Sequence, residues 1–259
     1  MVDYAQGSGK QYHIGVGPED IGEYVLLPGD PGRCESIASY FDNPKLVGNN
    51  REYVTYTGTL LGQRISVMST GIGGSSAAIG LEELVHCGAH TFIRVGTCGG
   101  MQRDIVGGDI IIPTGAIRME GTSREYTPIE FPAVPDFELT RRLVDSAIEL
   151  NASYHTGVTQ SKDSFYGQHE PEAKPVGLEL LYKWNAWISA GCLGSEMENA
   201  ALFIVGTYLK VRVASVLLVI ANQEREKLHL PNPQVHDMDI PIKVSVNAIQ
   251  KMIRDDMEK

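Results

Sequence analysis

The chain has 259 residues, of which 42% are hydrophobic and 21% charged, and this length predicts one domain covering residues 1–259. Its formal net charge of −10 provides no broad positive surface, which excludes nucleic acid as an expected partner.

Nothing in the sequence predicts a membrane segment or a zinc site. No apolar run approaches the roughly 20 residues that a membrane-spanning helix needs, and residues 1–10 are polar and glycine-rich rather than a signal sequence. The cysteines have neither C-x-x-C pairs nor histidines at zinc-ligand spacing. We therefore expect a cytoplasmic protein whose cysteines are reduced thiols: Cys34, Cys87, Cys98 and Cys192.

Short apolar runs alternate with helical patterns along the chain, which predicts an α/β fold with a central, largely parallel sheet covered by helices. The expected strands are residues 24–27, 64–69, 91–95, 109–113 and 213–220. The expected helices are residues 75–87, 137–151, 182–189, 196–209 and 240–257.

Three of the expected strands end in glycine-rich turns, at residues 28–32, 70–74 and 96–100. Ligands of open α/β sheets bind at the carboxyl ends of strands, so the convergence of these turns predicts a ligand site. Residues 168–177 are rich in Pro, Glu and Gly without periodicity, and we expect a mobile loop beside this site.

Two arginines lie where an anion could bind. Arg33 follows the first glycine-rich turn, although an ordinary turn with a solvated arginine explains the same residues. Arg94 lies inside an apolar run, where a guanidinium is costly to bury unless it meets an anion or several acceptors. A structural ion pair is the alternative for Arg94. Arg51 is a third candidate, but by itself it reads as an ordinary loop residue.

Two further motifs have both a structural and a functional interpretation. The turn from Thr70 to Ser76 resembles a dinucleotide-binding fingerprint, but it lacks the final glycine and the ribose-binding acid. A strand-to-helix turn explains it at least as well. Glu196 and Glu198 are expected in the first turn of a helix, where they could complement the helix dipole, or a carboxylate could accept two hydrogen bonds from neighbouring sugar hydroxyls.

Together these segments resemble the uridine phosphorylase branch of the hexameric nucleoside phosphorylase family, from His13 to the last helix. The resemblance implies a three-layer α/β/α fold with a mixed sheet. It rests on the order and spacing of Pro28-Gly29-Asp30-Pro31 with Arg33, Arg51-Glu52-Tyr53, Ser69-Thr70-Gly71-Ile72-Gly73-Gly74, Ile93-Arg94-Val95-Gly96-Thr97, Glu130-Phe131-Pro132-Ala133-Val134 and Glu196-Met197-Glu198.

The resemblance implies cleavage of uridine by inorganic phosphate to uracil and ribose 1-phosphate, with deoxyuridine and thymidine as further candidates. The implied phosphate ligands are the Gly29 backbone, Arg33, Arg94 and Thr97, with Arg51 supplied by a neighbouring subunit. The implied ribose ligands are Thr97, Glu196, Met197 and Glu198, with His13 of a neighbouring subunit near the 5′-hydroxyl. Positive charge on the sugar and negative charge on the departing base would be stabilised from the two ends of the site. Arg94, Thr97, Glu198 and Lys162 are the expected catalytic residues.

For the base, the resemblance implies that Phe165 stacks on it, with Ile220 nearby, and that the Gln168 amide reads it. Sites shared between subunits imply an obligate dimer, and the family assembles three dimers into a hexamer. No cofactor is expected. A potassium ion is implied at the dimer contact near Glu52, Ile72 and Ser76.

The chain departs from the family where the base is read. Purine-cleaving relatives have an aspartate at the position of Asn222, which cannot act as an acid, and this favours uridine. Glu170 and Gln223 stand where uridine phosphorylases have arginines. The run Lys-Asp-x-Phe-Tyr-Gly-Gln-His-Glu-Pro at residues 162–171 is shared by some relatives and indicates a distinct subfamily.

We expect Lys162 to donate to the uracil carbonyl in place of the missing arginine, with His169 as the second candidate; a solvated loop lysine is the alternative. For the chain as a whole the alternatives are a purine or broad-specificity phosphorylase, a nucleosidase, and a non-catalytic nucleoside-binding homologue. An NAD-dependent oxidoreductase is disfavoured by the missing acid after Gly71.

Overall fold

The computed structural model describes residue 7 and residues 9–258, and its centre is a mixed β-sheet. In the described residues the order of the nine strands across the sheet is β2-β3-β4-β1-β5-β8-β7-β6-β9. The strands are β1 Tyr24–Pro28, β2 Asp42–Asn50, β3 Tyr53–Leu60, β4 Gln63–Met68, β5 Thr91–Gly100, β6 Ile110–Met119, β7 Tyr154–Lys162, β8 Gly194–Glu196 and β9 Arg212–Asn222.

One half of the sheet closes on itself. Strand β5 pairs with β9 in parallel along its whole length, and the end of β5 pairs with β8 in the opposite direction. Because β8, β7, β6 and β9 are also paired in succession, these strands and β5 form a closed ring. The closure brings the carboxyl ends of β5 and β9 next to β7 and β8, where the candidate site lies.

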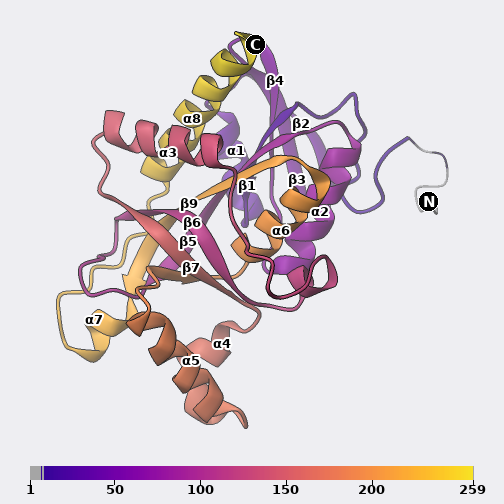
Figure 1. Cartoon of the computed structure of the whole chain (residues 1–259). Coiled ribbons are helices and arrows are strands. Elements are labelled where there is room, and N and C mark those ends of the chain that lie inside the picture. Colours follow the sequence, from indigo (N-terminus) through magenta and orange to yellow (C-terminus); the bar gives the residue numbers. More distant parts are fainter. Residues whose placement is uncertain (1–6, 8, 259) are drawn as a thin grey trace.

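Helices cover the sheet on both faces (Figure 1). They are α1 Cys34–Ala38, α2 Gly74–His86, α3 Phe137–Glu149, α4 Phe165–His169, α5 Gly177–Ser189, α6 Asn199–Leu209, α7 Gln223–Lys227 and α8 Asp239–Met257, with 3-10 turns η1 Pro31–Arg33, η2 Thr122–Glu125 and η3 Pro171–Ala173. None of the helices among residues 9–258 combines the length and apolar content that a membrane span requires.

Side chains alternate along β1 between two hydrophobic cores. Tyr24 and Leu26 pack in the core formed with α1, α3 and α8. Val25 and Leu27 pack in the core formed with α2 and α6. Since successive residues of a strand point to opposite faces, this alternation identifies β1 as a central strand between two helical layers. The expected three-layer α/β/α fold is confirmed.

Every expected strand and helix is present, with ends shifted by a few residues, but four strands were missed. Strand β2 is an exposed edge strand that contains Pro44 and irregular pairing, so it carries no alternating pattern. Strand β7 ends in buried polar residues, from Thr159 to Lys162, which resemble a loop in sequence. Strands β3 and β8 were also not predicted.

Two local expectations were wrong. Residues 168–177 are not a structureless loop, because α4 ends at His169, η3 follows, and α5 begins at Gly177. The helix expected to open at Glu196 begins instead at Asn199, since Glu196 is the last residue of β8.

A buried arginine holds the segment that follows β6. The Arg118 guanidinium, 7% exposed, donates to the backbone oxygens of Ser123, Thr127, Pro128 and Phe131 at 2.5–2.8 Å, and to the Ser123 hydroxyl at 2.9 Å. All five of its N–H groups are used in this way. Arg118 therefore holds η2 and the residues that follow it as far as Phe131.

Replacing Arg118 by Met should lower the free energy of unfolding by about 3 kcal/mol, because several buried carbonyl groups lose their donor. Urea denaturation of the parent and the variant measures this. The exposed neighbour Arg124, replaced by Met, is the control and should change stability by less than about 0.5 kcal/mol. Equal small changes in both variants would show that Arg118 is not required for this segment.

Candidate active site

A cavity of about 840 Å³ opens at the carboxyl ends of β1, β5 and β9, beside the ends of β7 and β8. Most of the residues expected at the site line it. They are Gly29, Arg33, Arg94, Thr97, Lys162, Phe165, Gln168, His169, Glu196, Met197, Glu198 and Ile220, together with Ile72. Segments far apart in the sequence therefore contribute to a single cavity.

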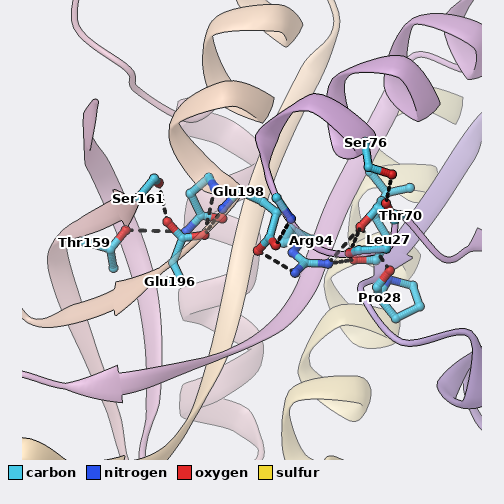
Figure 2. Close-up of polar contacts among 12 residues, drawn as sticks. Leu27, Pro28, Thr70, Ser76, Arg94, Thr159, Ser161, Glu196 and Glu198 are labelled. Atoms are coloured by element: carbon cyan, nitrogen blue, oxygen red, sulfur yellow. Dashed lines mark hydrogen bonds and ion pairs between the residues drawn. The ribbon is translucent and has the colours of Figure 1, made fainter. Parts of the chain in front are cut away.

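A buried ion pair forms the centre of this cavity (Figure 2). The Arg94 Nη2 atom lies 2.7 Å from Oε2 of Glu198, and the two side chains are 6% and 5% exposed. Arg94 Nη1 also donates to the Leu27 backbone oxygen at 3.3 Å and to the Thr70 hydroxyl at 3.2 Å. The structural ion pair considered for Arg94 thus exists, and it lies within the ligand cavity.

The turn before α2 contacts the same carboxylate. The backbone N–H of Gly73 donates to Glu198 Oε1 at 2.7 Å, and Gly73 has a φ of 97°, which favours glycine. Glu198 therefore accepts one hydrogen bond from Arg94 and one from the N-terminal end of α2. The turn at Thr70–Ser76 is a strand-to-helix connection whose backbone helps hold an acidic side chain.

Arg33 adds a second cation near Arg94. Burial lowers the pKa of Arg33, and the positive charge of Arg94 lowers it further, while Asp30 acts in the opposite direction. Gly29 lies against Arg94, because a Cβ atom there would be 3.1 Å from Nη2 of Arg94. A larger residue would crowd the guanidinium. Each arginine has one carboxylate within 4.0 Å, Asp30 for Arg33 and Glu198 for Arg94, and the remaining N–H groups of the two cations favour an anion.

Glu196 lies behind Glu198 and holds the start of α6. Its Oε2 atom accepts the backbone N–H groups of Glu198 at 2.7 Å and Asn199 at 2.8 Å, and its Oε1 accepts the Ser161 hydroxyl. Burial and the charge of Glu198 raise the pKa of Glu196 to about 7, although the three hydrogen bonds favour the ionised form. The interpretation of an acid that complements the helix dipole is correct for Glu196.

This raised pKa makes the stability depend on pH. A carboxyl whose pKa is higher in the folded than in the unfolded protein stabilises the fold at low pH, and this contribution is lost as pH rises from 4.5 to about 7. Relative to Glu196→Gln, the parent should lose on the order of 3 kcal/mol of unfolding free energy across this range. Urea denaturation at both ends of the range measures the difference, and parallel stability curves would contradict the assignment.

Lys162 is not a solvated loop lysine. It ends β7, is 6% exposed, and donates through Nζ to the Ser195 hydroxyl at 2.8 Å. Burial lowers its pKa, while the carboxylates of Glu196 and Glu198 act in the opposite direction. The structure therefore places a buried amine at the far end of the cavity from Arg33.

Three of the remaining predicted base-binding residues, Phe165, Gln168 and His169, lie on α4, and the fourth, Ile220, lies on β9. Phe165 is 52% exposed, and its ring centroid is 4.4 Å from that of His169. Burial, followed by the charge of Lys162, lowers the pKa of His169. The neutral imidazole is therefore favoured, which makes His169 a poor replacement for an arginine. Gln168 lines the cavity and donates to the Gln223 side chain at 3.1 Å.

Two predicted site residues lie away from this cavity of their own chain. His13 Nδ1 is 2.6 Å from Glu83 Oε1, and the Glu83 carboxylate also accepts the backbone N–H groups of His13 and Ile14. Arg51 has its guanidinium 5.5 Å from the centre of the Tyr12 ring. Neither residue lines the cavity.

The residues expected at a potassium site are partly grouped. Glu52 Oε1 accepts the Ser76 hydroxyl at 2.6 Å, and this hydrogen bond lowers the pKa of Glu52. Ile72, which is 77% exposed, could offer only its backbone oxygen. Across residue 7 and residues 9–258, His, Cys, Asp and Glu nowhere form a cluster of three or more that could hold a metal ion. The oxygen atoms of Glu52 and Ser76 suit a hard cation.

Asn222, identified from the sequence as unable to act as an acid, has a structural role. Its side chain is fully buried, donates to the Gln102 and Ile105 backbone oxygens at 2.7 and 2.9 Å, and accepts the N–H groups of Glu224 and Arg225 at the start of α7. It does not line the cavity. Asn222 is therefore a capping residue with no free group for a base.

Several cavity residues were not singled out from the sequence. They are Asp30, Pro31, Gly71, Cys98, Gly99, Ser195, Ala221 and Glu226. Ser195 directly precedes Glu196-Met197-Glu198, so its nearness to that motif was the one available signal. Its hydrogen bonds depend on β7 and α4, which the sequence does not place beside it.

The profile of the Phosphorylase superfamily matches residues 23–240. The chain belongs to the Phosphorylase superfamily. Among proteins of this superfamily, the uridine phosphorylase of Treponema pallidum is 58% identical over 95% of both chains. The uridine phosphorylase of Thermococcus kodakarensis is 45% identical over 83% of this chain and 78% of its own. The guanosine phosphorylase of Halorubrum lacusprofundi is 36% identical over 93% of this chain and 98% of its own.

Proposed function

We propose that the chain is a uridine phosphorylase, a pentosyltransferase that cleaves uridine with inorganic phosphate to uracil and ribose 1-phosphate. The observation that carries this proposal is the buried Arg94–Glu198 pair, which lies between a second arginine at one end of the cavity and a buried lysine with an amide at the other. A uridine phosphorylase 58% identical over 95% of this chain supports the choice of reaction.

Phosphate binds at the arginine end of the cavity. The Arg94 guanidinium has five N–H groups, and its contacts to Leu27, Thr70 and Glu198 leave two of them, one on Nη2 and the one on Nε, for phosphate oxygens. Arg33, the Gly29 backbone and the half-buried Thr97 complete the set. These groups orient the anion for attack on the sugar carbon, which removes much of the entropic cost of the reaction.

Ribose binds between Met197 and the Glu198 carboxylate. Each oxygen of Glu198 retains a lone pair after the contacts to Gly73 and Arg94, so the carboxylate can accept sugar hydroxyls. Its negative charge also stabilises the positive charge that develops on the sugar as the glycosidic bond stretches. Glu196 holds the N-terminal end of α6 and thereby the position of Glu198.

The base binds at the lysine end, stacked on Phe165 with Ile220 beside it. Gln168 reads the ring N–H and a carbonyl group. Lys162 has two N–H groups beyond its contact with Ser195, and one of them donates to a uracil carbonyl oxygen as negative charge develops. A buried ammonium is effective here because a low dielectric strengthens its interaction with that charge.

His13 and Arg51 act in the site of a neighbouring subunit, in a homo-oligomer of dimers that reaches a hexamer. Both lie outside the cavity of their own chain, and Glu83 holds His13 by its Nδ1 atom and so leaves Nε2 for a 5′-hydroxyl. A potassium ion at the dimer contact would take oxygen ligands from Glu52, Ile72 and Ser76. The reaction itself needs no cofactor.

The purine alternative is favoured by one observation, the 36% identical guanosine phosphorylase. It would need an acid for the purine ring nitrogen, and Asn222 is buried and occupied. Glu226, an exposed residue that lines the cavity, is the carboxyl group that could be considered as this acid. Uridine remains the proposed substrate.

The first test is uracil release from uridine with and without inorganic phosphate, with identification of the sugar product. Phosphate-dependent release of uracil with ribose 1-phosphate is expected, because two arginines line the cavity. Release without phosphate would instead identify a nucleosidase. Cleavage of guanosine or inosine in preference to uridine would establish the purine alternative.

Replacing Lys162 by Met should lower kcat for uridine by about 100-fold, because a charged donor to the departing base is lost. Lys174→Met is the control, since this lysine lies between η3 and α5 and does not line the nucleoside cavity, and it should retain the kcat of the parent. A Lys162→Met enzyme within about twofold of the parent would show that Lys162 is not the donor.

A further inference from the structure

A chain of hydrogen bonds connects Lys162 to the residue that reads the base. Lys162 Nζ donates to Ser195 Oγ at 2.8 Å, and Ser195 Oγ lies 2.7 Å from Oε1 of Gln168. Ser195 Oγ also lies 3.0 Å from Oε1 of Gln160. Lys162, Ser195 and Gln160 are 6%, 3% and 3% exposed, so water does not compete for these groups.

The charge of Lys162 determines which groups donate and which accept along this series of hydrogen bonds. A protonated lysine can only donate, so Ser195 accepts its hydrogen bond. The single hydroxyl hydrogen of Ser195 must then go to a glutamine oxygen, either Gln168 or Gln160. The charged donor polarises the hydroxyl group and strengthens the bond that it donates.

The choice between the two glutamines determines which way the Gln168 amide faces. When Ser195 donates to Gln168, the amide oxygen faces Ser195 and the amide nitrogen donates to Gln223 at 3.1 Å. When Ser195 donates to Gln160 instead, Gln168 can rotate and donate its N–H to Ser195. The shorter distance, 2.7 Å against 3.0 Å, favours the first state.

We propose that Ser195 is a positioning residue that sets the orientation of the Gln168 amide and thereby selects uracil over cytosine. The inference rests on the proposed function, because it assumes that Gln168 faces a pyrimidine. In the favoured orientation Gln168 can accept a hydrogen bond from a ring N–H and donate one to the neighbouring carbonyl oxygen. Uracil offers this pair of groups. Cytosine has an unprotonated N3, which would meet the amide oxygen, and it fits only the rotated amide.

Gln160 competes with Gln168 as the acceptor of the Ser195 hydroxyl hydrogen. Its Nε2 atom lies 2.9 Å from the sulfur of Met119, a weak acceptor, so few strong contacts hold its own orientation. Without the Gln160 oxygen, Ser195 would have a single acceptor. Replacing Ser195 should therefore lower the preference for uracil, whereas replacing Gln160 should not lower it.

The test compares the affinities for uracil and cytosine in Ser195→Ala and Gln160→Met, measured by isothermal titration calorimetry in phosphate buffer. In Ser195→Ala the amide is free to rotate, and the preference for uracil over cytosine should fall by about tenfold. In Gln160→Met the preference should be kept or increased. Thermal melting of both variants shows whether they remain folded.

A merely structural role for Ser195 predicts a different result. It would weaken both bases equally, or it would make Gln160→Met lose selectivity as Ser195→Ala does, and either outcome would overturn the inference. An unchanged preference in Ser195→Ala would do the same. Because calorimetry needs no turnover, a parent that binds uracil but does not cleave uridine would refute the proposed function alone.

Discussion

The buried pair of Arg94 and Glu198 is the interaction on which the rest of the site depends. It joins the middle of β5 to the start of α6, and Gly73 extends the contact to the start of α2. A buried ion pair is costly unless its hydrogen bonds are satisfied. Here the Gly73 backbone at the start of α2, the Leu27 oxygen of β1 and the Thr70 hydroxyl supply hydrogen bonds to the pair, so the geometry of the site and the positions of α2 and α6 constrain each other.

The part of the cavity around Lys162 contains a buried ammonium group rather than a buried ion pair. A buried lysine at the end of β7 and a serine of β8 lie beside Gln168, and no arginine among residues 9–258 lines this part of the cavity. Burying an ammonium group costs free energy because water is removed from it. Glu196 and Glu198 offset part of this cost through their negative charge. Glu198 therefore interacts both with Arg94 and with Lys162, which couples these two cations electrostatically.

Many of the residues that line the cavity could be identified from the sequence, because they belong to short motifs with a recognisable order of residues. Gly29, Arg33, Arg94 and Glu198 belong to short motifs at strand ends, and the cavity contains all four. The strand that ends at Lys162 was not predicted, because its buried polar residues make a strand look like a loop in sequence. Ser195 was missed because a lone serine has no distinctive pattern.

The sequence by itself determined the three-layer α/β/α fold and the motifs of the site, because hydrophobic periodicity and glycine-rich turns are local properties of the chain. Only the tertiary structure decided which side chains meet. The pairing of β7 with β8 brings Lys162 to Ser195, and the closure of the sheet between β5 and β9 brings both to the mouth of the same cavity. Hydrogen-bond direction and burial depend on such long-range contacts, and no local pattern of residues encodes them.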